Sequence, residues 1–167
     1  MNSRDAVIAE IPRLRRYARA LTGSMDAADD LVQATLERAM EKWSSWQRDR
    51  DLRPWLFSIM HNLHVDQVRR GKHIDYCAEE SLPDIPYRAE QLDSLEIRDL
   101  DRALALLPVE QREVLLLAGL EGLSYKEVAG TLGIPAGSVM SRLSRARTRL
   151  KAILAGNDAP HLRVVKL

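Results

Sequence analysis

Apolar residues recur at spacings of three and four along most of the chain, the pattern of helices that bury one face. No stretch alternates between apolar and polar positions as a half-buried strand does, and no hairpin signal is present. The pattern therefore predicts an all-α fold. The predicted helices cover residues 7–21, 26–46, 53–71, 95–107, 110–120, 124–132 and 136–154.

Residues typical of helix ends mark several of these boundaries. Gly23 and Gly71 are stop signals for the first and third helices, and Pro108 is one for the fourth. Asp26 is the predicted N-cap of the second helix. A charged loop, residues 47–52, separates the second helix from the third.

The distribution of charge divides the chain into two halves. Residues 74–97 hold seven acidic residues and one basic residue, whereas residues 1–73 have a net charge of +3 and residues 98–167 a net charge of +4. The acidic stretch also contains Pro83 and Pro86, so it predicts a flexible linker between two small helical domains, each with a modest core. The predicted organisation is a first domain at 1–73, a linker at 74–94, a second domain at 95–155 and a C-terminal tail at 156–167.

Composition excludes several classes of protein. The 167 residues have a net charge of +1 and a single cysteine, Cys77, which rules out an internal disulfide and a multi-cysteine zinc site. No apolar run is long enough to span a membrane, and the start of the chain does not resemble a secretory signal, so we expect a cytoplasmic protein without membrane insertion. No nucleophile–base grouping, phosphate-binding loop or metal cluster is present, so we expect neither an enzyme nor a cofactor.

The most informative segment is a short helix, a turn and a long helix near the C-terminus. Ser124 is a predicted N-cap, and Glu127 occupies the capping-box position. Gly133-Ile134-Pro135 forms the turn before the final helix, 136–154. This is the layout of a helix-turn-helix, whose second helix enters the DNA major groove.

The final helix has an apolar side and a neighbouring polar side. Spacing places Val139, Leu143, Ala146, Leu150 and Ile153 on the first side and Ser138, Ser141, Arg142, Arg145 and Arg149 on the second. One side can pack on the domain while the other presents guanidinium and hydroxyl groups to DNA. The alternative interpretation is that the basic residues of this C-terminal helix face solvent, where they suit the helix dipole, and contact no DNA.

At this level of detail the chain resembles the extracytoplasmic-function (ECF) sigma factors of bacterial RNA polymerase. Residues 107–117, 121–129 and 133–147 are similar to their region 4. Residues 26–33 resemble region 2.2, and residues 54–62 with Asp66, Arg69 and Arg70 resemble regions 2.3 and 2.4. The resemblance covers roughly residues 5–155 and includes both halves in the same order.

The resemblance implies that the protein binds core RNA polymerase and directs it to promoters. Region 2 would contact the β′ clamp, and region 4 the β flap. The implied β′ contacts are Asp30 and Gln33, with apolar contact from Leu31 and Leu36. Many relatives have a glutamate where this chain has Ala34, and Asp30 and Gln33 are also compatible with an ordinary solvated helix face.

The resemblance also assigns DNA contacts to the first half. Region 2 would melt the −10 element and hold a flipped base in a pocket, where Asn62 matches the base-binding position. Trp46 and Trp55 are expected to be core residues, and His61 and His64 to pack or lie at the surface. The implied contacts to the −10 strand backbone and the adjoining duplex are Arg48, Arg50, Arg53, Arg69 and Arg70.

In region 4, the final helix would lie in the major groove of the −35 element. Ser141, Arg142 and Arg145 are candidates for base contacts, and Ser138, Arg147 and Arg149 for phosphate contacts. Relatives usually carry Lys or Arg where this chain has Met140, so one basic contact is missing.

The resemblance further implies control by an anti-sigma factor that clamps both domains. The acidic linker is either a solubility feature or a polyanion that occupies the RNA channel of the polymerase, and Cys77 is an incidental thiol or a redox switch.

Two other functions remain as alternatives. One is a stand-alone helix-turn-helix regulator that binds duplex operators, which would need a dimerisation or sensor element. The other is a sigma-mimicking adaptor, against which the basic final helix argues.

Overall fold

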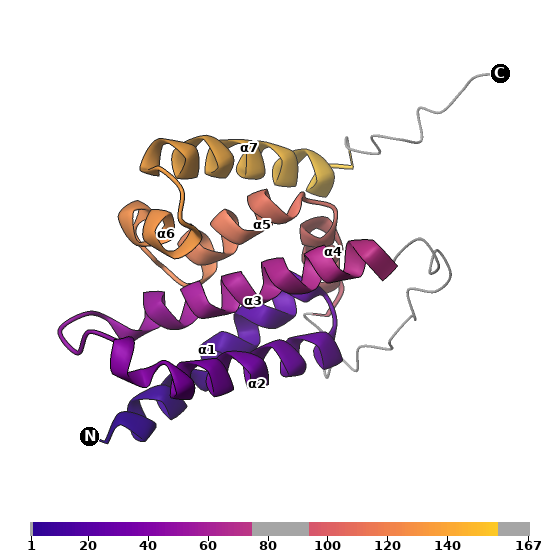
Figure 1. Ribbon diagram of the computed structural model, residues 1–167. Coiled ribbons are helices and arrows are strands. Elements are labelled where there is room, and N and C mark those ends of the chain that lie inside the picture. Colours follow the sequence, from indigo (N-terminus) through magenta and orange to yellow (C-terminus); the bar gives the residue numbers. More distant parts are fainter. Residues whose placement is uncertain (1, 75–93, 157–167) are drawn as a thin grey trace.

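The computed structural model describes residues 2–74 and 94–156, and all regular elements in those ranges are helical, as predicted. The N-terminal half (residues 2–74) and the C-terminal half (residues 94–156) each form a helical bundle (Figure 1). The N-terminal half contains α1 (Ser3–Thr22), α2 (Met25–Glu41), the 3-10 turn η1 (Trp43–Ser45) and α3 (Leu52–Ile74). The C-terminal half contains α4 (Ser94–Ala105), α5 (Val109–Leu115), the π turn η2 (Leu116–Leu120), α6 (Tyr125–Leu132) and α7 (Ala136–Leu154).

The second helix differs from its prediction at both ends. Its N-cap is Ser24, in an extended conformation, whose Oγ accepts the Ala27 N–H at 3.3 Å, so Asp26 lies in the first turn instead. The helix ends at Glu41, and the chain then turns so that Trp43, Trp46 and Trp55 pack together with ring centroids 5.0–6.4 Å apart. Trp46 and Trp55 are half-buried against the core, which confirms their predicted packing role.

The third helix continues past its predicted stop. Gly71 lies inside α3, which reaches Ile74. A glycine ends a helix where the chain adopts a left-handed conformation, as Gly23 does at φ +70, and Gly71 does not adopt one.

The single helix predicted at residues 110–120 is an α-helix that changes into a π turn. The Glu121 N–H donates to the carbonyl of Leu116, five residues earlier, at 3.0 Å. The wider turn carries Glu121 toward the N-terminal half, where it meets α1.

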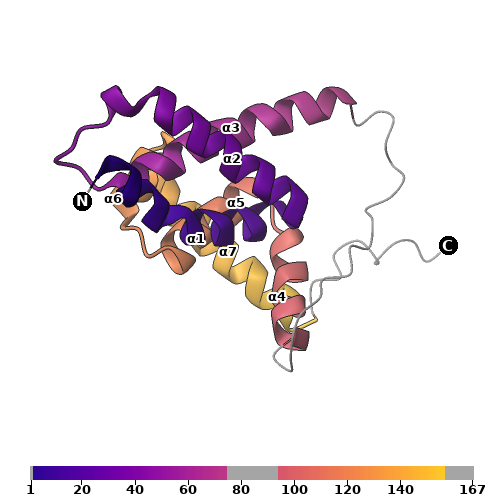
Figure 2. The ribbon, with the colours of Figure 1, turned by 90° about the horizontal axis from the view of Figure 1, so that it is seen from below.

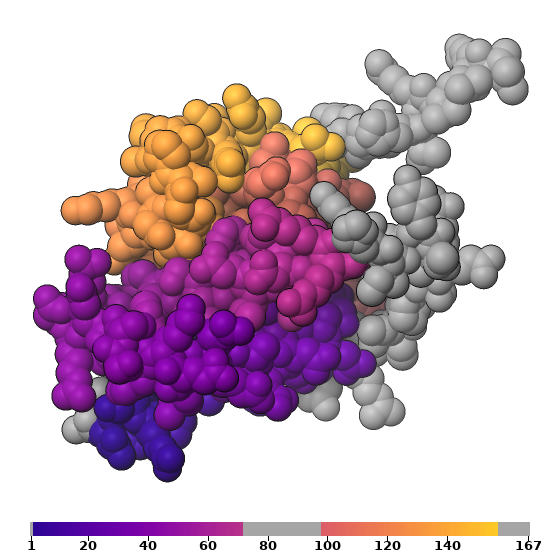
Figure 3. All heavy atoms as spheres, in the orientation of Figure 1, coloured from indigo at the N-terminus to yellow at the C-terminus, as the bar shows by residue number. Residues whose placement is uncertain are grey.

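The two halves pack against each other over a broad face. α6 packs on α3, α5 and η2 pack on α1, and α7 lies on the outer side of α5 and α6, while the sphere view shows the two halves in continuous contact (Figures 1, 2 and 3). The Thr131 hydroxyl of α6 donates to the Pro54 carbonyl of α3 at 3.5 Å. One buried apolar cluster includes Leu14 and Phe57 from the N-terminal half and Leu117 from the C-terminal half, so the cores of the two halves are continuous across the junction. The predictions for the acidic linker, Cys77 and the tail concern residues outside the described ranges.

Candidate nucleic-acid and polymerase interface

The helix-turn-helix forms from short-range contacts that the sequence predicted. The Ser124 hydroxyl accepts the Glu127 N–H at 3.1 Å, and the Glu127 carboxylate accepts the Ser124 N–H at 2.8 Å. Gly133 ends α6 in the left-handed conformation at φ +66, and Pro135 is the N-cap of α7. These contacts fix the angle at which α7 leaves the turn.

The long helix α7 buries one side and leaves another open. Val139, Leu143 and Ala146 are buried in the C-terminal half, as predicted. Of the polar residues assigned to DNA, Ser141, Arg145 and Arg147 are exposed, whereas Ser138, Arg142 and Arg149 are half-buried. The Ser141 hydroxyl donates to the Gly137 carbonyl at 3.0 Å, within the same helix.

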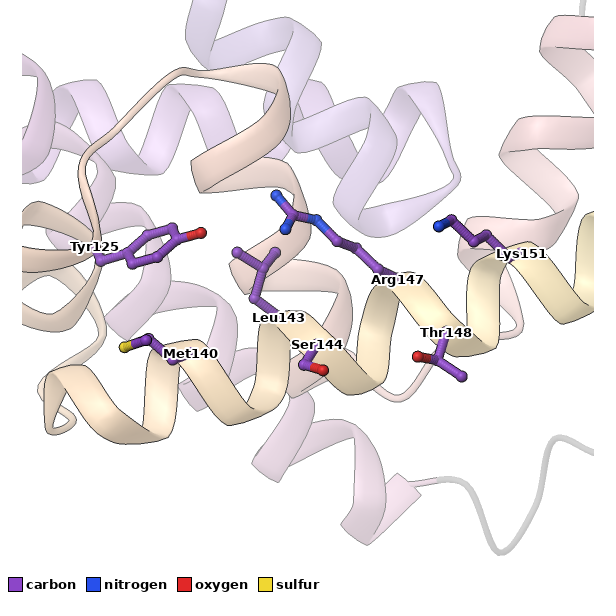
Figure 4. Close-up of a pocket in the computed structure, with 7 residues that line it drawn as sticks. All are labelled: Tyr125, Met140, Leu143, Ser144, Arg147, Thr148 and Lys151. Atoms are coloured by element: carbon purple, nitrogen blue, oxygen red, sulfur yellow. The ribbon is translucent and has the colours of Figure 1, made fainter.

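A hollow of about 310 Å³ lies beside the open side of α7 (Figure 4). Tyr125, at the start of α6, points its hydroxyl toward Leu143, while Arg147 and Lys151 reach out from later turns of α7 (Figure 4). Sequence reasoning missed Tyr125, Ser144 and Thr148 as members of this surface. For Ser144 and Thr148 the signal is present in the sequence, because residues 140, 144, 147, 148 and 151 follow helical spacing along one face. The lining residues are Tyr125, Met140, Leu143, Ser144, Arg147, Thr148 and Lys151.

The residues assigned to polymerase contact lie on α2, but not all of them reach its surface. Asp30 and Gln33 are exposed, and Leu36 is half-buried. The Gln33 side-chain amide donates to Glu37 at 3.2 Å. Leu31 is 0% exposed and belongs to the core, so the expectation that it makes apolar contact with a partner is wrong for this conformation.

The residues assigned to the −10 element lie along α3 and the loop before it. Arg48 and Arg50 are exposed in the loop, and Asn62 is exposed near the middle of α3. Arg53 is half-buried, and its Nε lies 3.8 Å from a carboxylate oxygen of Glu10. Arg69 and Arg70 are exposed about 10–12 Å further along the helix axis than Asn62, at about 1.5 Å per residue.

The junction between the halves holds buried charged groups that sequence reasoning did not bring together. The Arg16 guanidinium donates to both carboxylate oxygens of Glu121 at 3.2–3.3 Å. His61 Nδ1 lies 2.8 Å from Glu113 Oε1, an ion pair when His61 is protonated. Arg112 donates to the Leu21 carbonyl of α1 at 2.6 Å and to three carbonyls of its own half.

Burial shifts several pKa values at this junction. It raises the pKa of Glu121, with Arg16 acting in the opposite direction. Burial raises the pKa of Tyr17 well above its usual value, and Glu113 and Glu121 raise it further. Burial lowers the pKa of His64, an effect that Glu113 opposes and that His61 and Arg112 reinforce. These shifts follow from the burial of Tyr17, His64 and Glu121 at the junction.

Within the described residues, no three His, Cys, Asp or Glu side chains gather as a metal site. Across residues 2–74 and 94–156, no helix is long and apolar enough to cross a membrane.

Comparison with known proteins defines the class. Residues 7–61 match the family described as Sigma2 domain of PhyR, and residues 97–150 match Sigma-70, region 4. The chain is 38% identical over 152 residues to the ECF RNA polymerase sigma factor EcfG of Rhodopseudomonas palustris, covering 90% of this chain and 84% of the relative. It is 37% identical over 157 residues to SigE of Mycolicibacterium smegmatis, covering 88% of this chain and 59% of the relative.

Solved structures agree with this assignment. The sigma factor RpoE from Bartonella quintana, crystallised with the anti-sigma factor NepR, has a TM-score of 0.82 and 35% identity, covering 91% of this chain and 96% of the other. CnrH, in complex with the cytosolic domain of CnrY, has a TM-score of 0.69 and 28% identity, covering 93% and 91%. The identity to EcfG over most of both chains shows the family. The chain belongs to the ECF RNA polymerase sigma factors, which are not a class of enzymes.

Proposed function

We propose that this protein binds core RNA polymerase in the cytoplasm, recognises the −35 and −10 elements of its promoters and starts transcription without catalysis or a cofactor of its own. The observation that carries this proposal is the order of parts. A Sigma2-like half precedes a helix-turn-helix whose second helix has an open basic side. Either part alone would fit other DNA- or protein-binding roles.

In the −35 role, α7 enters the major groove with Ser141 and Arg145 toward base edges. Arginine donates two hydrogen bonds to guanine, and serine bonds to either partner of several base pairs. Arg147 and Lys151 beside the hollow supply cations for phosphates, and the Tyr125 hydroxyl adds a neutral donor. The half-buried Ser138, Arg142 and Arg149 lie at the edge of this surface and have less freedom to reach DNA.

In the −10 role, α3 and the preceding loop hold the melted strand. Asn62 offers both a donor and an acceptor to the edge of a flipped base. Arg48, Arg50 and Arg53 would follow the backbone of the single strand, and Arg69 and Arg70 would bind duplex phosphates upstream. The polymerase contact would be the exposed face of α2 around Asp30 and Gln33, bordered by Leu36, for the β′ clamp, with the C-terminal half meeting the β flap.

An anti-sigma factor is the proposed regulator. A groove of about 1130 Å³ runs between α1, α4 and η2, with Leu100 and Leu120 exposed in it. Arg15, Arg19 and Arg102 line it together with a single acid, Asp101, so an acidic amphipathic helix is the partner segment that fits it. With NepR of Bartonella quintana as the probe, we expect Leu120→Asp to weaken binding at least tenfold, and unchanged binding would exclude this groove.

Multi-round transcription with purified core polymerase on a pool of bacterial genomic fragments tests the function. We expect new start sites that share upstream −10 and −35 sequences, and we expect Arg145→Ala to abolish most of them. Arg4→Ala is the matched control, because Arg4 is an exposed arginine of α1 outside every proposed contact.

Two results would favour the other functions. No new transcript together with tight, salt-sensitive duplex binding by the protein alone would indicate a stand-alone regulator. No transcript and no DNA binding, with retained NepR binding, would indicate an adaptor.

A further inference from the structure

Two carboxylates of the C-terminal half are buried where it faces the N-terminal half. The side chain of Glu121 is 0% exposed, and that of Glu113 is 3% exposed. Removing an ionised carboxylate from water is unfavourable unless a counter-charge and hydrogen bonds replace the lost hydration. Burying Glu113 and Glu121 is therefore favourable only if groups across the junction supply counter-charge and hydrogen bonds.

The groups that they meet both belong to the N-terminal half. Arg16 of α1 binds Glu121 through two nitrogens, and His61 of α3 bonds to Glu113. We call these contacts, Arg16–Glu121 and His61–Glu113, the junction pairs. The partners are 105 and 52 residues apart in the sequence, so the junction pairs exist only while the halves are packed together.

The surroundings make the junction pairs a single charged unit. The buried Tyr17 ring lies next to Arg16 in the sequence and interacts electrostatically with both carboxylates. Arg13 and Arg53 act on Glu121, while His64 and Arg112 lie near Glu113 and His61. The unit reaches solvent through Arg16 and Arg13, whose side chains are 52% and 43% exposed.

The packed arrangement cannot serve both promoter elements at once. The −35 and −10 elements are centred roughly 25 base pairs apart, which is about 85 Å at about 3.4 Å per base pair. A compact chain of this length has a radius of gyration of about 15 Å. As long as α6 packs on α3, the distance between α7 and Asn62 is therefore too short for α7 to occupy the −35 element while Asn62 occupies the −10 element.

We propose that the junction pairs hold the free protein in this closed form and that they must separate before it can occupy a promoter. The effect on promoter binding rests on the proposed sigma function. The closed form itself does not, because it can be measured in the protein without polymerase or DNA. Separation returns both carboxylates to water, so the cost of breaking the junction pairs is partly offset by hydration. A charged junction of this kind is one that polymerase binding can open.

The first experiment measures closure without polymerase or DNA. A Cys77→Ser background carries cysteines at Asp29 of α2 and Leu154 of α7, both exposed, for spin labels or fluorophores. We expect a short, narrow distance distribution. Arg16→Ala combined with His61→Ala removes the hydrogen-bonded partner of each buried carboxylate, and we expect it to raise the ratio of open to closed molecules about tenfold.

A rescue variant separates charge from lost packing. Adding Glu121→Gln and Glu113→Gln to the same double variant removes the unpaired charges, so we expect the short distance to return. Arg15→Ala is the matched control, because Arg15 is an exposed arginine beside Arg16 on α1, and it should leave the distribution unchanged. An unchanged distribution in the double alanine variant, or an absence of rescue, would overturn the proposal.

The second experiment measures affinity for core polymerase with Arg16→Ala alone. Arg16 lies outside the proposed polymerase and DNA contacts, and an open chain avoids the conformational cost of opening. We expect the variant to bind core polymerase more tightly than the wild type, by up to the same tenfold, with Arg15→Ala unchanged. A closed chain that starts no transcription would contradict the sigma function alone, whereas transcription with equal affinities would contradict the role of the junction pairs alone.

Discussion

At the scale of single residues, Met140 is the clearest departure from the expected basic surface. It is 57% exposed on the open side of α7, where the family resemblance predicted Lys or Arg. We expect Met140→Lys to tighten binding to a −35 duplex severalfold at low salt and to steepen the dependence of log K on log salt by about one unit, because one more phosphate is neutralised. Fluorescence anisotropy over a salt series measures both quantities.

Met40→Lys is the control for this change. Met40 is an exposed methionine of α2, so the variant adds the same net charge away from α7. If both lysine variants tighten binding equally, the effect comes from overall charge, and the placement of Met140 near the DNA backbone is wrong.

His64 allows a test of burial through pH. It is 8% exposed, and its lowered pKa means that the unfolded chain takes up the proton first as the pH falls. His64 therefore contributes full stability above about pH 6.5 and progressively less below it, by at most about 1.4 kcal/mol per pH unit. Urea unfolding at pH 7.5 and 5.5 should show a larger loss for the wild type than for His64→Leu, and equal losses would contradict the burial of a neutral imidazole.

At the scale of elements, helix bounds were predicted well where contacts within a few residues determine them, and poorly where contacts with distant residues do. The helix-turn-helix was predicted closely because Ser124, Glu127 and Gly133 act on backbone groups within a few residues. The end of α2 was predicted too late because Trp43 and Trp46 keep a helical spacing, yet they turn to meet Trp55 on α3. Tertiary contact overrides local periodicity at that point.

The turn before α7 supports a prediction about two glycines. Gly133 has φ +66, a conformation that a Cβ disfavours, so Gly133→Ala should destabilise the fold by about 1–2 kcal/mol. Gly130→Ala, inside α6 with no atom within 4 Å of its new Cβ, should stabilise by up to about 1 kcal/mol. Urea unfolding measures both changes, and if both have the same sign the left-handed turn is not what positions α7.

At the scale of the whole molecule, the packing of the two halves was beyond prediction from the sequence. The sequence assigned no role to Arg16, Glu113 or Glu121, and His61 was expected to pack or lie at the surface, because nothing local connects these four residues. Their pairing depends on the path that η2 and α3 take in three dimensions. The candidate DNA residues on α7 were found because they share one helix, whereas Tyr125 was missed because it reaches the same hollow from another.

The last prediction concerns whether the packed halves unfold together. All three tryptophans, Trp43, Trp46 and Trp55, lie in the N-terminal half, so their fluorescence reports that half alone while circular dichroism reports both. Leu143→Ala removes a side chain that is 2% exposed in the C-terminal half and should cost about 2–5 kcal/mol there.

If the junction joins the halves into one cooperative unit, this distant change lowers the urea midpoint of tryptophan fluorescence along with that of circular dichroism. With Arg16→Ala and His61→Ala also present, the halves are uncoupled, and the fluorescence midpoint should no longer respond to Leu143→Ala. A fluorescence midpoint that ignores Leu143→Ala even with the junction pairs intact would show that the halves unfold independently. In that case the contact between α3 and α6 contributes too little free energy to keep the free protein closed.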